Sequence, residues 1–105
     1  MKTEDPASEA LIEELAAAAE GVVVSLRLNE GLPEQKRERL SSALSRAARQ
    51  WSETPYVPKR LAAILVELYP AVEASSHLYA GEEAVAIQQA AAEVYEQCMH
   101  ILGSE

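Results

Sequence analysis

The fold class of this chain depends on the stretch Leu11–Leu28, which reads LIEELAAAAEGVVVSLRL. Its apolar residues recur at intervals of three and four, which is typical of one face of an amphipathic helix. After Gly21, the segment Val22–Leu28 also shows the alternation of a half-buried strand. The sequence offers no second strand to pair with it, and a lone strand is not stable. We therefore predict a helix through Val22–Leu28, with Gly21 as the place where a kink would fall.

Three more stretches have helical periodicity, and Pro, Gly or polar turns separate them. Pro70 lies inside the third predicted helix, where it removes a hydrogen bond and predicts a kink. Short connections favour an all-α fold, an antiparallel four-helix bundle with up-down-up-down topology. We expect one domain over residues 1–105, with residues 1–5 and 103–105 frayed. The helices are predicted to begin at Asp5, after Pro33, near Pro58 and at Glu82, and the first three to end near Asn29, Trp51 and Tyr79.

The composition indicates a globular chain with a thin core. Of the 105 residues, 49% are hydrophobic, but there is no Phe and only one Trp, and alanine is abundant. Alanine buries little area, so we expect closely spaced helices. Met1–Pro6 has no leader pattern, and no apolar run reaches the length of a membrane span. Because Cys98 is the only cysteine, no internal disulfide can form, and we expect a reducing, cytoplasmic location.

Charge is divided unevenly along the chain. The net charge is −8, yet the segment 34–60 contains seven basic and three acidic residues, a net +4, which leaves −12 for the rest. The acidic balance argues against nucleic acid or membrane partners and allows a basic protein partner. Lys36, Arg37, Arg39, Arg46 and Arg49 could form a nucleic-acid face, but a solvated helix has the same composition. We expect the basic second helix to be neutralised partly by its acidic neighbours.

Residues with catalytic or metal-binding chemistry are few. Glu73 with His77, and Glu96 with His100, have the i,i+4 spacing that places two side chains on one helix face. The two pairs are expected about 24 Å apart along the bundle, too far to share a metal ion. Cys98 lies on the apolar stripe and diverges from His100, so we expect a buried thiol. The sequence therefore predicts no catalytic residues, no metal and no cofactor.

Aromatic and basic residues are concentrated around the connection between the second and third helices. We expect Trp51, Tyr56 and Tyr69 to meet at that corner. The cations Arg49, Lys59 and Arg60 are close to these residues in the sequence. Such a corner could bind an anionic ligand or a partner side chain. It could equally close one end of the core.

Two classes of function remain open from the sequence. We favour a non-enzymatic protein–protein interaction module, such as an adaptor, a dedicated chaperone or an immunity-type inhibitor. The alternative is a small-molecule-binding or enzymatic bundle that uses the aromatic corner. A broad exposed apolar patch would favour the first, and a deep pocket beside the aromatic residues the second. Because the first helix has apolar residues on more than one face, we also predict a homodimer that covers Val24 and Leu28.

Overall fold

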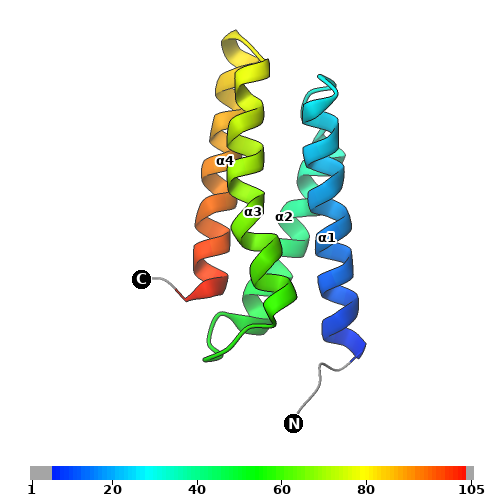
Figure 1. The fold of residues 1–105 in the computed structure, drawn as a ribbon, viewed down its shortest axis with the longest axis vertical. Coiled ribbons are helices and arrows are strands. Elements are labelled where there is room, and N and C mark those ends of the chain that lie inside the picture. Colours follow the sequence, from blue (N-terminus) through cyan, green and yellow to red (C-terminus); the bar gives the residue numbers. More distant parts are fainter. Residues whose placement is uncertain (1–5, 104–105) are drawn as a thin grey trace.

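The computed structural model describes residues 6–103, which form an all-helical bundle (Figure 1). The prediction of an all-α fold is confirmed, and the described residues include no strand. The elements in chain order are α1 (Pro6–Arg27), α2 (Glu34–Trp51), α3 (Lys59–Ser75), the short 3₁₀ helix η1 (Ser76–Leu78) and α4 (Gly81–Leu102).

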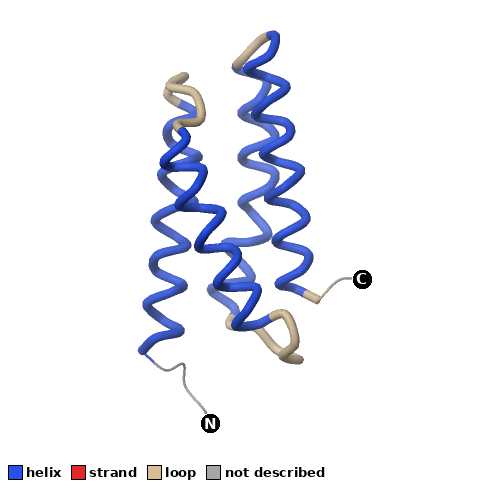
Figure 2. Tube along the Cα trace, turned by 180° about the vertical axis from the view of Figure 1, so that it is seen from behind, coloured by secondary structure: helices blue, strands red, loops and turns tan. Residues whose placement is uncertain are grey.

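Successive helices run antiparallel and form two hairpins, α1–α2 and α3–α4, which pack side by side (Figure 2). Between the hairpins, α1 contacts α3 and α2 contacts α4. Both of these neighbouring pairs run parallel, whereas α2 and α3 lie diagonally opposite each other. The loop between α2 and α3 therefore crosses the end of the bundle. The elongated molecule measures 49 × 27 × 18 Å along its principal axes.

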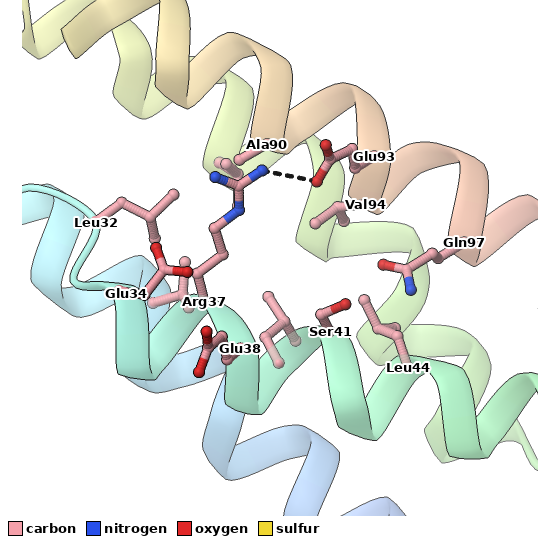
Figure 3. Close-up of a pocket in the computed structure, with 13 residues that line it drawn as sticks. Leu32, Glu34, Arg37, Glu38, Ser41, Leu44, Ala90, Glu93, Val94 and Gln97 are labelled. Carbon is pink, nitrogen blue, oxygen red and sulfur yellow. Dashed lines mark hydrogen bonds and ion pairs between the residues drawn. The ribbon is translucent and has the colours of Figure 1, made fainter.

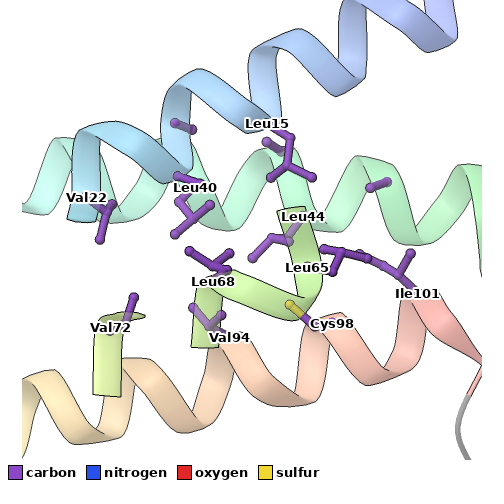
Figure 4. Packing of buried hydrophobic residues seen from close by; sticks show 14 of the residues in the cluster. Leu15, Val22, Leu40, Leu44, Leu65, Leu68, Val72, Val94, Cys98 and Ile101 are labelled. Carbon is purple, nitrogen blue, oxygen red and sulfur yellow. The ribbon is translucent and has the colours of Figure 1, made fainter. Parts of the chain in front are cut away.

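The core is a single stripe of aliphatic side chains along the bundle axis (Figure 4). All four helices contribute to it, and buried alanines lie among the larger side chains. Ala43 and Ala47 of α2 are completely buried, as expected for closely spaced helices. The buried residues labelled in Figure 4 are Leu15, Val22, Leu40, Leu44, Leu65, Leu68, Val72, Val94, Cys98 and Ile101.

The helix boundaries agree with the sequence in most places. Residues 22–27 are helical, so the prediction of helix over strand is confirmed for that segment, and Leu28 lies in the following turn. Asn29 and Gly31 have positive φ angles of 63° and 79°, which end the helix in the left-handed conformation that such residues tolerate. The predicted cap at Asp5 and the fraying of residues 1–5 and 104–105 lie outside the described residues. Gly103 caps α4 with a φ of 85°.

The third helix was predicted to end near Tyr79; its α-helical part ends at Ser75, and the 3₁₀ turn η1 continues it to Leu78. Two hydroxyl groups explain this ending. Ser75 donates a hydrogen bond to the Ala71 carbonyl and Ser76 donates one to the Glu73 carbonyl. Such side chains compete with the backbone for helical hydrogen bonds. Pro70 lies within α3, where the predicted kink stays a prediction.

Tyr79 joins the upper ends of the two hairpins. Its hydroxyl donates a hydrogen bond to the Leu26 carbonyl near the end of α1 and accepts one from the Gly31 amide, both at 2.9 Å. Ser25, which is completely buried, donates a further bond to the Gly31 carbonyl. These bonds satisfy backbone groups that a helix end leaves without partners.

Candidate functional site

The predicted aromatic corner is divided among three environments. Trp51 belongs to the core with 6% of its surface exposed, whereas Tyr56 lies in the loop and is 84% exposed. Tyr69 lies ten residues into α3, about 15 Å from its first residue at the rise of a helix. Its ring contacts Tyr95 of α4 edge to face, with centroids 5.2 Å apart. The structure therefore pairs Tyr69 with α4, away from the α2–α3 loop.

The predicted cations also have separate roles. Arg60 forms an ion pair with Glu13 of α1 at 2.7 Å, and this contact lowers the pKa of the Glu13 carboxyl. Arg49 is exposed and borders a shallow surface groove together with Arg46. Lys59 is exposed at the first turn of α3. These residues do not surround a common pocket in the described structure.

Ion pairs between helices account for part of the basic character of α2. Arg46 forms two hydrogen bonds to the Glu14 carboxylate of α1, and these lower the pKa of that carboxyl. Arg37 forms an ion pair with Glu93 of α4 at 2.8 Å. The basic helix is thus bound to acidic residues on both of its neighbours, as the charge pattern predicted.

A cluster that the sequence pattern does not predict lies on the outer side of the α3–α4 hairpin. Because the rings of Tyr69 and Tyr95 are in contact, these two residues lie at the same level of the antiparallel helices α3 and α4. Val66 precedes Tyr69 by three residues and Leu102 follows Tyr95 by seven, so both lie on the same side as the ring pair. Val66 is 63% exposed, Tyr95 47% and Leu102 37%. We call Val66, Tyr69, Tyr95 and Leu102 the tyrosine face.

The outer side of α1 and the turn that follows it expose the two residues predicted for self-association, Val24 and Leu28. Val24 is 43% exposed and Leu28 62% exposed. Gly21 and Ala17 continue this side at spacings of three and four residues, so we call Ala17, Gly21, Val24 and Leu28 the α1 stripe. A Cβ atom added to Gly21 would meet no atom within 4 Å, so packing within the monomer does not require glycine there.

A pocket of about 150 Å³ opens between α2 and α4 and reaches the core (Figure 3). Its rim carries the Arg37–Glu93 ion pair together with Glu34 and Glu38. All four helices contribute to its inner wall. The apolar residues of that wall are Val22, Leu40, Leu44, Val72, Ala90 and Val94, all buried.

Groups with nucleophilic or metal-binding chemistry are not assembled in the described residues. Cys98 is 3% exposed, and burial raises the pKa of its thiol to about 11, so the reactive thiolate is scarce at neutral pH. Glu73 and His77 are 4.0 Å apart and both partly exposed. Within residues 6–103, no three His, Cys, Asp or Glu side chains come together as metal ligands.

Comparison of this chain with known proteins finds no relative. The chain matches no family model, no curated protein and no solved structure. None of the helices among residues 6–103 combines the length and apolar character that crossing a bilayer requires. The functional argument therefore depends on the surfaces and the pocket described above.

Proposed function

We propose that this chain is a non-enzymatic protein–protein interaction module that binds a protein partner through the tyrosine face. The observation that carries the proposal is the exposure of large apolar side chains on two adjoining helices around the Tyr69–Tyr95 contact. Isolated apolar residues are common on protein surfaces, but contiguous ones frequently mark interaction sites. The single thiol, Cys98, supports a reducing, cytoplasmic setting as part of this proposal.

The composition of the tyrosine face suits a binding surface. Tyrosine combines a large apolar ring with a polar hydroxyl and is enriched among residues that dominate binding energy. The edge-to-face contact with Tyr69 restrains the Tyr95 ring, so little conformational freedom is left to lose on binding. Val66 and Leu102 extend the apolar surface along the hairpin.

The partner we propose presents an amphipathic helix with basic flanks. The seam between two antiparallel helices accepts a third helix whose apolar face lies along it. Glu73, one turn beyond Tyr69, and Glu96, next to Tyr95, would face the flanks of such a helix. Together with the net charge of −8, these carboxylates favour positively charged flanking residues and faster association.

The same proposal includes self-association through the α1 stripe. A glycine in mid-helix costs about 1 kcal/mol relative to alanine, and Gly21 has no neighbour in the monomer that explains it. A second helix packed closely against Gly21 would explain it. If two copies of α1 pair antiparallel about a point between Val23 and Val24, less than one turn from Gly21, Arg27 of one copy lies opposite Glu20 of the other. Neither residue has an ion pair among the described residues, so charge complementarity favours a two-fold dimer.

The alternative function, a small-molecule site at the predicted aromatic corner, has less support. The pockets described above are lined by residues other than Trp51, Tyr56 and Tyr69. Tyr69 instead contributes to the tyrosine face.

A pull-down from the native host tests partner binding. Tyr95→Asp and Val66→Asp place a charge in the centre of the tyrosine face and should release a protein that the wild type retains. Val85→Asp is the matched control, because Val85 is 51% exposed on α4 about 15 Å from Tyr95. A set of retained proteins that is identical for all four chains would contradict the proposal.

Sedimentation at micromolar concentration tests self-association separately. The wild type should sediment as a dimer, and the double variant Val24→Lys, Leu28→Lys as a monomer with unchanged helicity. Val85→Lys should remain dimeric. A monomeric wild type would remove the self-association part and leave the partner proposal to the pull-down.

A further inference from the structure

The pocket between α2 and α4 connects the surface with the apolar core. At about 150 Å³, it matches the engineered apolar cavity, also about 150 Å³, that binds benzene in another protein. A concave apolar pocket with a few polar groups at its mouth is a candidate binding site for a small molecule.

The inner and outer parts of the pocket differ in chemistry (Figure 3). The inner wall is formed by apolar side chains such as Leu44 and Val72, which are at most 1% exposed. Such a wall offers a water molecule few of the two to four polar partners that it needs. The outer rim has three carboxylates, on Glu34, Glu38 and Glu93, and one guanidinium, on Arg37.

The charges of the rim are not balanced. Arg37 is engaged by Glu93 at 2.8 Å across the mouth, from α2 to α4. Glu34 and Glu38 have no ion pair among the described residues, and both are exposed on α2. The rim therefore has a net charge of −2, which attracts a cation to the mouth and repels an anion.

We propose that this pocket binds a small amphiphilic cation, with an apolar body of about benzene size and a primary amine. The apolar body occupies the inner wall between α2 and α4, and the ammonium group stays at the rim beside Glu34 and Glu38. In such a ligand, the apolar body matches the apolar inner wall, and the ammonium group matches the acidic rim. This binding uses none of the residues of the tyrosine face, which lies on the outer side of the α3–α4 hairpin.

Three probes of nearly equal size separate the apolar contribution from the charge. Benzylamine, benzyl alcohol and benzoate would each be titrated into the isotopically labelled protein at low salt, with amide and methyl shifts recorded by NMR. Saturable shifts should appear at Val22, Leu44, Val72 and Val94. Benzylamine should bind about two- to fivefold tighter than the alcohol, as exposed charge contacts allow, and benzoate weakest.

Two variants assign the binding to this pocket. Glu34→Gln with Glu38→Gln changes only exposed side chains and should remove the advantage of benzylamine over benzyl alcohol. Ala90→Leu points a larger side chain into the pocket and should abolish binding of all three probes while helicity is kept. The proposal is overturned if no probe gives saturable shifts, if benzoate binds as tightly as benzylamine, or if a folded Ala90→Leu protein binds like the wild type.

Discussion

The hydroxyl of Tyr79 lies 2.9 Å from the carbonyl oxygen of Leu26, and this contact joins the turn of the second hairpin to the end of α1. The same hydroxyl accepts the Gly31 amide, so one side chain satisfies two backbone groups of the α1–α2 turn. Tyr79→Phe keeps the ring and removes both bonds, so the free energy of unfolding should fall by about 1–3 kcal/mol. Urea unfolding measures this, with Tyr56→Phe as a control, because Tyr56 is exposed. A loss no larger than in the control would mean that the hydroxyl does not tie the hairpins.

Acid should weaken the contact between α1 and α2. Arg46 holds the pKa of the Glu14 carboxyl below its usual value, so this contact stabilises the fold above pH 4.5 and is lost as the pH falls through the lowered pKa. In Glu14→Gln, the free energy of unfolding should decrease less as the pH falls from about 5 to about 3. Glu53→Gln makes the same change in the exposed turn after α2, where the described structure gives the side chain no ion pair, and should leave the wild-type decrease intact. If the unfolding free energy of both variants depends on pH in the same way, the role of Arg46 is contradicted.

Alkali should weaken the core at Cys98. Burial raises the pKa of this thiol from 9.0 to about 11, so the unfolded chain loses the thiol proton before the folded chain does. The contribution of the thiol to stability is present below pH 9 and is lost as the pH rises toward 11. The difference in unfolding free energy between the wild type and Cys98→Ala should shrink across this interval. A thiol reagent should also label Cys98 at the rate of unfolding, and fast labelling of the folded protein would show that the thiol is accessible.

Pro70 lies on the exposed side of α3, where it gives the backbone no amide hydrogen. Pro70→Ala should restore one helical hydrogen bond and leave stability equal or slightly higher. Thermal unfolding measures the change. A loss of several kcal/mol would mean that the predicted kink is required for packing.

The sequence predicted the helices well because the apolar stripe of each helix stops where helix-breaking residues begin. The apolar spacing of α1 continues through Val22 to Leu26, and this outweighed the short strand-like alternation. Asn29, Gly31, Pro33 and Pro58 then marked the ends through backbone preferences that depend only on local chemistry.

The candidate sites were harder to predict because they depend on which helices become neighbours. The sequence places Tyr69 near Trp51 because a short loop joins α2 and α3. These two helices lie diagonally opposite each other, and Tyr69 contacts α4 instead. The turn near Gly81 could have revealed this, since folding back there places Tyr69 opposite the middle of α4. The pocket depends on how closely two hairpins approach, which residue patterns do not encode.

The most direct test of the proposed function is photo-crosslinking in the native host. A photoreactive amino acid would replace Val66 in the tyrosine face and, in a separate strain, Val85 outside it. Val66 is 63% exposed and Val85 51%, so a photoreactive side chain at either position faces the solvent to a similar extent. The account predicts that Val66 yields one discrete cross-linked protein, which is lost when Tyr95→Asp is added, and that Val85 does not. Identical products from both positions, or none from Val66, would contradict it.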